Sequence, residues 1–338
     1  MRIAIANDNK ENVIILQHII EKISDHEVAW TAFDGADAVN KCANDTPDLI
    51  LMDMVMPILD GVAACHAIMQ NTPCAIIIVT SSVTENAAMI FEAMGYGALD
   101  VVKTPFTNIN SSTSETDDLL KKIKTVANLI DSDTSKNNIR CDNNILVNNK
   151  DKKLVVIGSS TGGPGVLATI LGSMPGDFSV PIIIVQHVDS TFTQSFASWL
   201  DKQSKLEVKI AREGDIPKAG LVLIAGESEH LVMLDGGKLS YTPDPKELVY
   251  KPSVNVFFNS VAKHWKGSII AGLLTGMGKD GAEGLANIRN VGGNTITQTQ
   301  ETCAVYGMPK AADDIGASMQ SLPPDEISAE IIKLVSGK

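Results

Sequence analysis

Short apolar runs alternate with amphipathic segments from the first residue to about residue 106, and the alternation resumes at residue 154. This pattern constrains the fold strongly, because neighbouring parallel strands need a long crossover connection, which is usually a helix. In the first half we expect strands over 2–6, 28–32, 49–52, 75–79 and 100–102, and helices over 11–22, 35–43, 61–70, 84–94 and 117–130. Five strands with intervening helices predict an α/β domain of the flavodoxin-like, doubly wound kind.

The second half repeats the alternation, which predicts a second doubly wound α/β domain. Its expected strands cover 154–157, 181–186, 207–210, 221–224, 230–234, 269–274 and 294–297. The intervening segment is polar and rich in asparagine apart from the apolar residues 145–147, as is typical of an interdomain linker. We therefore expect a first domain over 1–130, a linker over 131–153 and a second domain over 154–338.

Composition and charge exclude several classes of protein. The formal net charge of −12 argues against nucleic acid or an anionic membrane as the main partner, because phosphate groups bind basic surfaces. No apolar stretch has the length of a transmembrane helix, and the first residues run directly into a strand pattern, which predicts a cytoplasmic protein without direct membrane insertion. The five cysteines lack any Cys-x-x-Cys spacing and are expected to be reduced thiols.

The turn after the first strand of the second half has the sequence Gly158-Ser159-Ser160-Thr161-Gly162, a Gly-x-Ser-x-Gly pattern. Such a strand-to-helix turn presents its central serine, here Ser160, for nucleophilic attack. A phosphate-binding glycine loop is disfavoured, because neither Gly-x-Gly-x-x-Gly nor a following Gly-Lys-Ser/Thr is present. A tight turn with a capping serine remains an alternative at this point.

A nucleophilic serine needs a base and an acid that orients the base. His187 ends the apolar run 182–186 and would lie level with Ser160 if the two strands are neighbours, so it is the expected general base. Asp280 follows a third strand in the glycine-rich stretch 275–282 and is the expected acid, whereas Asp189 lies only two residues beyond the histidine. The other histidines are expected to be structural, with His230 a core or rim residue: His18, His26, His66, His230 and His264.

The same glycine-rich loop offers backbone N–H groups for an oxyanion. We expect the amide of Met277 to serve there together with the amide of Thr161. The chain order of the three expected catalytic residues is serine, histidine, acid. An α/β-hydrolase has the order serine, acid, histidine, so that fold is disfavoured despite its matching turn.

In the first domain, polar residues follow the expected strands, at the edge where open α/β sheets place their chemistry. The carboxylates of Asp8 and Asp53, with the carbonyl of Val55, offer hard oxygen ligands to Mg²⁺. An aspartate beside such an ion can accept a phosphoryl group, because the metal neutralises the incoming charge. The alternative is that these are solvated turn residues.

The stretch 48–61 closely resembles the phosphoacceptor strand and loop of response-regulator receiver domains, and the resemblance continues through 95–100. It implies that Asp53 is phosphorylated, that Asp8 is a metal ligand and that Thr80 is the switch hydroxyl. Two positions depart from the family. Asn7 stands where a second aspartate is usual, and Thr104 stands where receivers have a lysine, with Lys103 one residue earlier and therefore on the opposite face of its strand.

In the second domain, the stretches 158–163, 185–187, 275–281 and 306–309 look like the motifs of the chemotaxis protein-glutamate methylesterase family, CheB. The stretches 85–100 and 251–254 look most like the branch that serves Wsp-type surface sensing. The family often has alanine where this chain has Ser159.

The resemblance implies hydrolysis of glutamyl methyl esters on a methyl-accepting chemoreceptor, and deamidation of receptor glutamines, with no cofactor for catalysis. It also implies phosphorylation by a CheA-type histidine kinase, with Mg²⁺ in the receiver. From the domain order and the linker we expect the receiver to cover the Ser160 site until Asp53 is phosphorylated. A DNA-binding regulator is disfavoured for want of a basic helix-turn-helix. A non-catalytic, phosphorylation-dependent adaptor remains the alternative.

Overall fold

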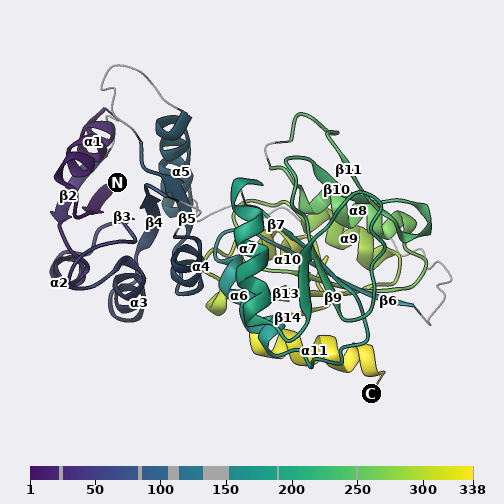
Figure 1. Cartoon of the computed structure of the whole chain (residues 1–338). Helices are drawn as coiled ribbons and strands as arrows, with labels where there is room; N and C mark the ends of the chain where they lie inside the picture. The colour runs from purple at the N-terminus through teal and green to yellow at the C-terminus, as the bar shows by residue number, and fades with distance from the viewer. Residues whose placement is uncertain are drawn as a thin grey trace. The chain divides into compact units, whose positions relative to one another are not determined.

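The computed structural model describes residues 1–22, 26–82, 86–105, 114–131, 152–188, 190–248 and 250–337, which divide into two compact units at residue 134. Figure 1 shows both units. Most of the predicted linker, its apolar residues 145–147 and Asp189 lie outside the described residues. No helix in the described ranges combines the length and apolarity needed to cross a membrane.

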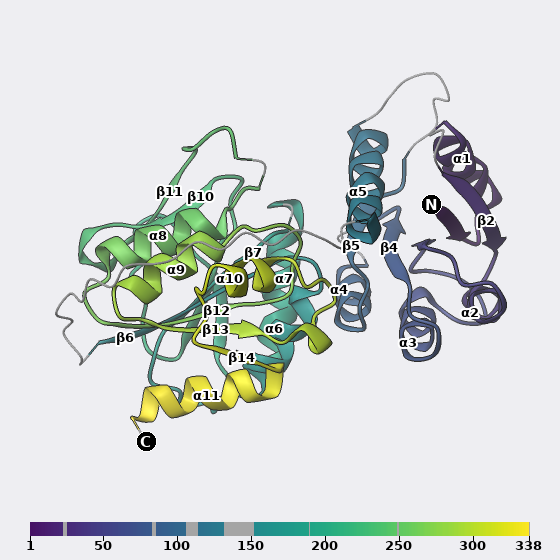
Figure 2. The same ribbon diagram turned by 180° about the vertical axis from the view of Figure 1, so that it is seen from behind.

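The first unit is a parallel sheet with helices on both faces. Its elements are β1 (Arg2–Ala6), α1 (Lys10–Glu21), β2 (Glu27–Ala32), α2 (Gly35–Asn44), β3 (Leu49–Met52), α3 (Gly61–Asn71), β4 (Ala75–Thr80), α4 (Ala87–Gly95), β5 (Asp100–Lys103) and α5 (Ser114–Asp131). The strand order is β2-β1-β3-β4-β5 with all neighbours parallel, which confirms the predicted flavodoxin-like fold. Figures 1 and 2 show α1 and α5 on one face of the sheet and α2, α3 and α4 on the other.

Strand β3 shows why this sheet forms. All four of its residues are fully buried, as expected for a central parallel strand that is covered on both faces. Several predicted boundaries differ by one to three residues: α4 begins at Ala87, three residues after the predicted start at residue 84, and α5 begins at Ser114, three residues before the predicted start at Asp117. Glu115 and Asp117 lie in the first turn of this helix, where their negative charges favour its N-terminus.

The second unit is a larger parallel sheet. Its elements are β6 (Lys153–Ser159), α6 (Gly163–Gly172), β7 (Ile182–Gln186), α7 (Ser190–Gln203), β8 (Glu207–Ile210), β9 (Leu221–Ile224), β10 (His230–Met233), β11 (Leu239–Thr242), α8 (Val254–His264), β12 (Ser268–Leu273), α9 (Ala282–Asn290), β13 (Asn294–Gln298), α10 (Met308–Asp314), β14 (Gln320–Leu322) and α11 (Pro324–Ser336). The strand order is β14-β13-β12-β6-β7-β9-β8, all parallel, so the second predicted α/β domain is confirmed.

Strands β11 and β14 of this unit were not predicted, and the predicted strand β10 lies outside the main sheet. β14 has three residues, Gln320-Ser321-Leu322, too few to show a period. β11 pairs antiparallel with β10 in a separate two-stranded sheet, so β10 is not part of the main sheet. In Figures 1 and 2, α8 and α9 cover one face of the main sheet, and α6 and α11 cover the other.

The register of the main sheet determines where side chains meet. β6 lies between β7 and β12, with Ser159 opposite Gln186 and Gly158 opposite Leu273. The carboxyl ends of these three strands therefore lie side by side near the middle of the sheet. Crevices at this edge are where open α/β sheets bind their ligands.

Candidate active site

The Gly-x-Ser-x-Gly stretch forms the predicted strand-to-helix turn. Gly162 has a φ of 77°, a left-handed conformation that favours glycine, and α6 follows with a proline in its first turn. The Ser160 N–H donates to the Thr275 carbonyl at 3.0 Å, and its carbonyl accepts from the Gly163 N–H at 2.8 Å. These bonds fix Ser160 at the tip of the turn, between β6 and the loop that follows β12.

The two serines of the turn have different surroundings. Ser159 is fully buried, and its hydroxyl donates to Gln186 Oε1 at 2.6 Å. Ser160 is 7% exposed, and its hydroxyl has no hydrogen-bond partner among the described residues. Only Ser160 therefore has a hydroxyl available to a substrate.

Gln186 is the last residue of β7, and it received no role of its own in the sequence analysis of the stretch 185–187. Its amide nitrogen donates to the Ser160 carbonyl at 2.8 Å and to the His187 carbonyl at 3.0 Å. The fully buried amide thus fixes the backbone of both residues. The available signal was a polar residue at the end of an otherwise apolar buried strand.

His187 lies where the sequence predicted, beside the serine turn. The backbone N–H of His187 donates to the Ser159 carbonyl at 3.0 Å, and the ring nitrogen Nε2 lies 2.8 Å from Asp280 Oδ2. Its Nδ1 is buried and has no hydrogen-bond partner among the residues that the structure describes. Because a carboxylate only accepts, Nε2 carries the proton and the lone pair is on Nδ1. The ring of Tyr250 stacks on this imidazole, with centroids 4.5 Å apart and planes at 4°.

Asp280, in the loop before α9, contacts the N-terminus of α8. Besides the bond from His187, it accepts bonds from the Ser253 hydroxyl at 2.8 Å, the Val254 N–H at 2.7 Å and the Asn255 N–H at 3.0 Å. Burial alone would raise the pKa of this carboxyl, but the hydrogen bond and electrostatic interaction with His187, together with the bonds from Asn255 and Ser253, hold the pKa below its ordinary value. Asp280 is therefore ionised at neutral pH, and it meets His187 as predicted.

The loop after β12 closes the other side of the turn. A Cβ on Gly276 would lie 2.7 Å from the Ser160 Cβ, so only glycine permits this approach. The next residue, Met277, and Thr161 are both partly exposed, and in the described part of the chain their N–H groups have no protein acceptor. Both amides are therefore available as oxyanion donors.

The remaining histidines of the second unit have structural partners. His264 lies 2.7 Å from the exposed Asp235, and His230 is fully buried, which places it in the core rather than on the rim. In the first unit, the ring of His66 stacks on the ring of Tyr96.

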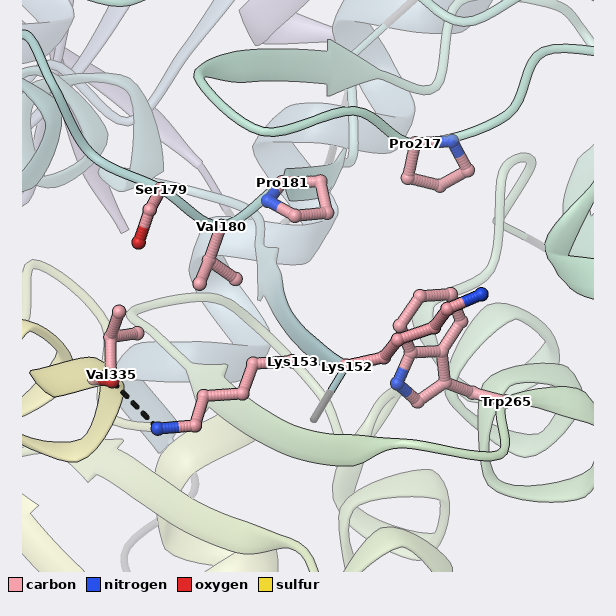
Figure 3. Close-up of a pocket in the computed structure, with 8 residues that line it drawn as sticks. All are labelled: Lys152, Lys153, Ser179, Val180, Pro181, Pro217, Trp265 and Val335. Atoms are coloured by element: carbon pink, nitrogen blue, oxygen red, sulfur yellow. Dashed lines mark hydrogen bonds between the residues drawn. The ribbon is translucent and has the colours of Figure 1, made fainter. Parts of the chain in front are cut away.

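Figure 3 shows a pocket of about 600 Å³ at the opposite edge of the main sheet, where β6 and β7 begin. Its lining includes Lys153, whose ammonium donates to the carbonyls of Leu334 at 3.1 Å and Val335 at 2.6 Å. That lysine caps the end of α11, a structural role. The pocket contains none of the residues of the serine turn or its partners.

In the first unit, Asn7 and Asp53 meet at the carboxyl edge of the sheet. Asn7 Nδ2 donates to Asp53 Oδ2 at 2.9 Å, while Asn7 Oδ1 accepts from the Asn9 N–H at 2.9 Å. The amide therefore presents its nitrogen, not its oxygen, to the predicted phosphoacceptor. Burial, with a smaller contribution from the Asp8 charge, raises the pKa of Asp53 to about 6.

These residues fit a magnesium ion. Two carboxylates close enough to raise one pKa are relieved by a divalent cation, and the Val55 carbonyl is a third hard oxygen donor. In the described ranges no cluster of three His, Cys, Asp or Glu side chains that could hold a metal is present.

The switch region departs from the receiver pattern as predicted. Thr80 is buried, and its hydroxyl accepts from Asn86 Nδ2 at 3.0 Å. Thr104 is 4% exposed and its N–H donates to the Thr80 carbonyl at 2.8 Å, whereas Lys103 is on the exposed side of β5. The lysine and Thr104 thus face opposite sides, as the alternation of a strand requires.

Comparisons with known proteins cover both units. A family model described as CheB methylesterase matches residues 155–331, and one described as response regulator receiver domain matches residues 3–111. The crystal structure of the Thermotoga maritima CheB methylesterase catalytic domain matches with a TM-score of 0.52 and 39% identity, covering 54% of this chain and 99% of that one.

Two curated relatives carry the name protein-glutamate methylesterase/protein-glutamine glutaminase. The protein numbered 2 of Cupriavidus metallidurans is 44% identical over 337 residues, covering 100% of this chain and 99% of the relative. The protein numbered 1 of Pseudomonas fluorescens is 46% identical over 335 residues, covering 99% of each. The predicted family and enzyme class are confirmed, and the adaptor alternative is not favoured; the assignment to a Wsp-type branch stays a prediction. The chain belongs to the CheB methylesterase family, in the form that carries an N-terminal response regulator receiver domain.

Proposed function

We propose that this chain hydrolyses glutamyl methyl esters of a methyl-accepting chemoreceptor, with Ser160 as nucleophile, His187 as general base and Asp280 as orienting acid. The observation that carries the proposal is the 2.8 Å contact between His187 and Asp280 beside a serine turn, with the second imidazole nitrogen unpaired. The names of the relatives support protein glutamyl methyl esters as the substrate class and deamidation of protein glutamine as a second reaction.

The chemistry follows from the protonation state of the imidazole. The Ser160 oxygen attacks the ester carbonyl while its proton passes to His187 Nδ1, and the N–H groups of Thr161 and Met277 stabilise the oxyanion. Collapse breaks the bond to the methoxy oxygen, which takes the proton from Nδ1 and leaves as methanol. Water then attacks the glutamyl-enzyme with the same base and releases the glutamate.

Asp280 stays ionised throughout these steps. Its charge stabilises the imidazolium, and its bond to Nε2 keeps the lone pair on Nδ1, the nitrogen that would take the serine proton. With glutamine as substrate, the leaving group is ammonia in place of methanol.

We further propose that phosphorylation controls the esterase. A CheA-type histidine kinase would phosphorylate Asp53, with Mg²⁺ held by Asp8, Asp53 and the Val55 carbonyl, where the ion neutralises charge on the incoming phosphoryl group. The receiver, residues 1–130, would cover the Ser160 site until then, with residues 131–153 as linker and 154–338 as catalytic domain. This regulation is refuted if phosphorylation leaves the activity unchanged and removal of residues 1–150 brings no gain.

The test of the nucleophile compares two adjacent serines. Ser160→Ala should abolish nearly all methanol release from methylated receptor, with an unchanged circular dichroism spectrum. Ser159→Ala removes a buried hydroxyl from Gln186 but no reacting atom, so it should lower stability by about 1–3 kcal/mol and retain measurable activity. Full methanol release after Ser160→Ala would exclude Ser160 as the nucleophile.

A further inference from the structure

The segment 243–253 joins β11 to α8 and, in its described residues, contacts the proposed catalytic residues at two points; we call it the Tyr250 loop. Tyr250 stacks on the His187 ring with centroids 4.5 Å apart and planes at 4°. At the end of the same loop, the Ser253 hydroxyl donates to Asp280. One loop thus contacts both the proposed base and its proposed partner.

A single buried imidazole holds this loop near both of its ends. His230, the first residue of β10, is fully buried. Its Nδ1 accepts from the Ser253 N–H at 3.0 Å, and its Nε2 lies 3.1 Å from the Pro245 carbonyl, to which it donates. Because Nδ1 accepts a backbone N–H, the proton is on Nε2 and both ring nitrogens are used. The position of Tyr250 over His187 is therefore fixed from the core.

The stacked ring has two consequences for an imidazole that gains and loses a proton. It blocks rotation of the His187 ring out of the plane in which Asp280 holds Nε2. In addition, the face of an aromatic ring attracts a cation, so the imidazolium formed after attack is stabilised relative to the neutral ring. A contact that strengthens as charge develops raises kcat and not substrate binding.

We propose that Tyr250 is a positioning residue for His187. The Tyr250 ring, in a loop held by the two hydrogen bonds of His230, keeps the imidazole of His187 in the reactive plane and stabilises the protonated imidazole. This inference rests on the proposed function of Ser160 and His187. It requires the aromatic ring and not the phenolic hydroxyl.

The experiment uses the full-length protein and methylated receptor. Tyr250→Leu should lower kcat about 3- to 30-fold with KM within about twofold, because a cation over an aromatic face contributes on that scale. Tyr250→Phe keeps the ring and should restore most of kcat. The matched control is Leu248→Ala: Leu248 is in the same loop and, like Tyr250, is 37% exposed, but it does not stack on the histidine.

Each alternative outcome overturns the proposal. A rise in KM with unchanged kcat would make Tyr250 a substrate-binding residue. An equal loss in Tyr250→Phe would assign the effect to the hydroxyl, and an equal loss in Leu248→Ala would assign it to the loop in general.

A second readout does not depend on esterase activity. A ring stacked at 4.5 Å shifts the carbon-bound proton resonances of His187 upfield in NMR spectra, so Tyr250→Leu should move them downfield while Tyr250→Phe should not. Unmoved resonances would overturn the stacking itself. An inactive wild-type protein with the expected NMR shifts would instead overturn the proposed function.

The two hydrogen bonds of His230 have their own test. His230→Phe keeps an aromatic ring at this position and removes both hydrogen bonds, so kcat should fall with KM unchanged. Because this effect passes largely through Tyr250, the variant carrying both His230→Phe and Tyr250→Leu should lose less than the product of the two single losses. Losses that multiply would overturn the claim that His230 acts through Tyr250.

Discussion

Replacement of Asp280 by asparagine tests the centre of the site, because the side chain keeps its shape and loses its charge and one acceptor. Oδ2 accepts from His187 Nε2 and from the Val254 N–H, and Oδ1 accepts from the Ser253 hydroxyl and from the Asn255 N–H. Whichever position the new amide nitrogen takes, it faces one backbone N–H in the first turn of α8. At least one buried donor is left without an acceptor.

The expected loss of stability follows from this unpaired donor and from the lost negative charge. An unpaired buried donor costs about 1–3 kcal/mol, and bonds to a neutral acceptor are weaker than bonds to an ionised one. We expect Asp280→Asn to lower the free energy of unfolding by about 2–4 kcal/mol. An amide N–H toward His187 would also force the ring proton onto Nδ1, so kcat should fall about 10³- to 10⁴-fold, the scale of such a substitution in a serine-histidine-aspartate site.

The measurements are urea unfolding and methanol release from methylated receptor. The matched control is Asp235→Asn, which changes a second aspartate that lies 2.7 Å from a histidine but is 87% exposed. The control should leave both the stability and kcat nearly unchanged, because exposed pairs contribute little. A loss in Asp280→Asn no larger than in the control would refute the reasoning.

The pH dependence has a defined sign. The pKa of Asp280 is lowered in the folded state, so its contribution to stability is fully present above the unfolded value near 4. That contribution is lost as the pH falls through the lower, folded pKa. The stability difference between wild type and Asp280→Asn should therefore shrink as the pH falls below about 4. A difference that grows in acid would contradict the direction of the shift.

Three further substitutions have defined outcomes. Asn7→Asp exchanges the N–H that faces Asp53 for a carboxylate and should strengthen Mg²⁺ binding about tenfold, as measured by titration of phosphorylation rate; an unchanged midpoint would count against Mg²⁺ at this edge. Gln186→Leu removes both bonds to the backbone carbonyls of the site and should lower kcat at least about tenfold and stability by about 2–4 kcal/mol, by activity assay and thermal unfolding. Gly276→Ala places a methyl group 2.7 Å from the Ser160 Cβ and should lower kcat with little change in KM; wild-type kinetics would show that the loop yields.

The positions of Ser160 and His187 could be predicted because they depend on strand ends. In a parallel sheet, residues that end neighbouring strands lie side by side, so two apolar runs of similar length were enough to bring the two residues together. The choice between adjacent serines also followed from local spacing. Asp280 required more, since nothing in its own loop shows that it meets a histidine 93 positions away.

The Tyr250 loop could not be predicted, for a physical reason. It has no hydrophobic period and is held by contacts to residues distant in sequence, among them His230 in β10. A histidine that opens an apolar run carries no signal of which backbone groups it will bind. The same limit explains Gln186, whose burial and partners depend on how the sheet packs.

Asp53 and Asp280, the proposed phosphoacceptor and the proposed orienting acid, have pKa values shifted in opposite directions, and the shifts match their roles. Asp53 is partly buried near another carboxylate, so its charge is disfavoured and its pKa rises to about 6; a divalent cation would favour the ionised form that must attack phosphorus. Asp280 is also largely buried, yet the first turn of α8, Ser253 and His187 all donate to it, and its pKa falls. It needs no ion to stay charged. The receiver chemistry should therefore depend on Mg²⁺, whereas the esterase step, with its negative charge built into the fold, should proceed in a chelating buffer.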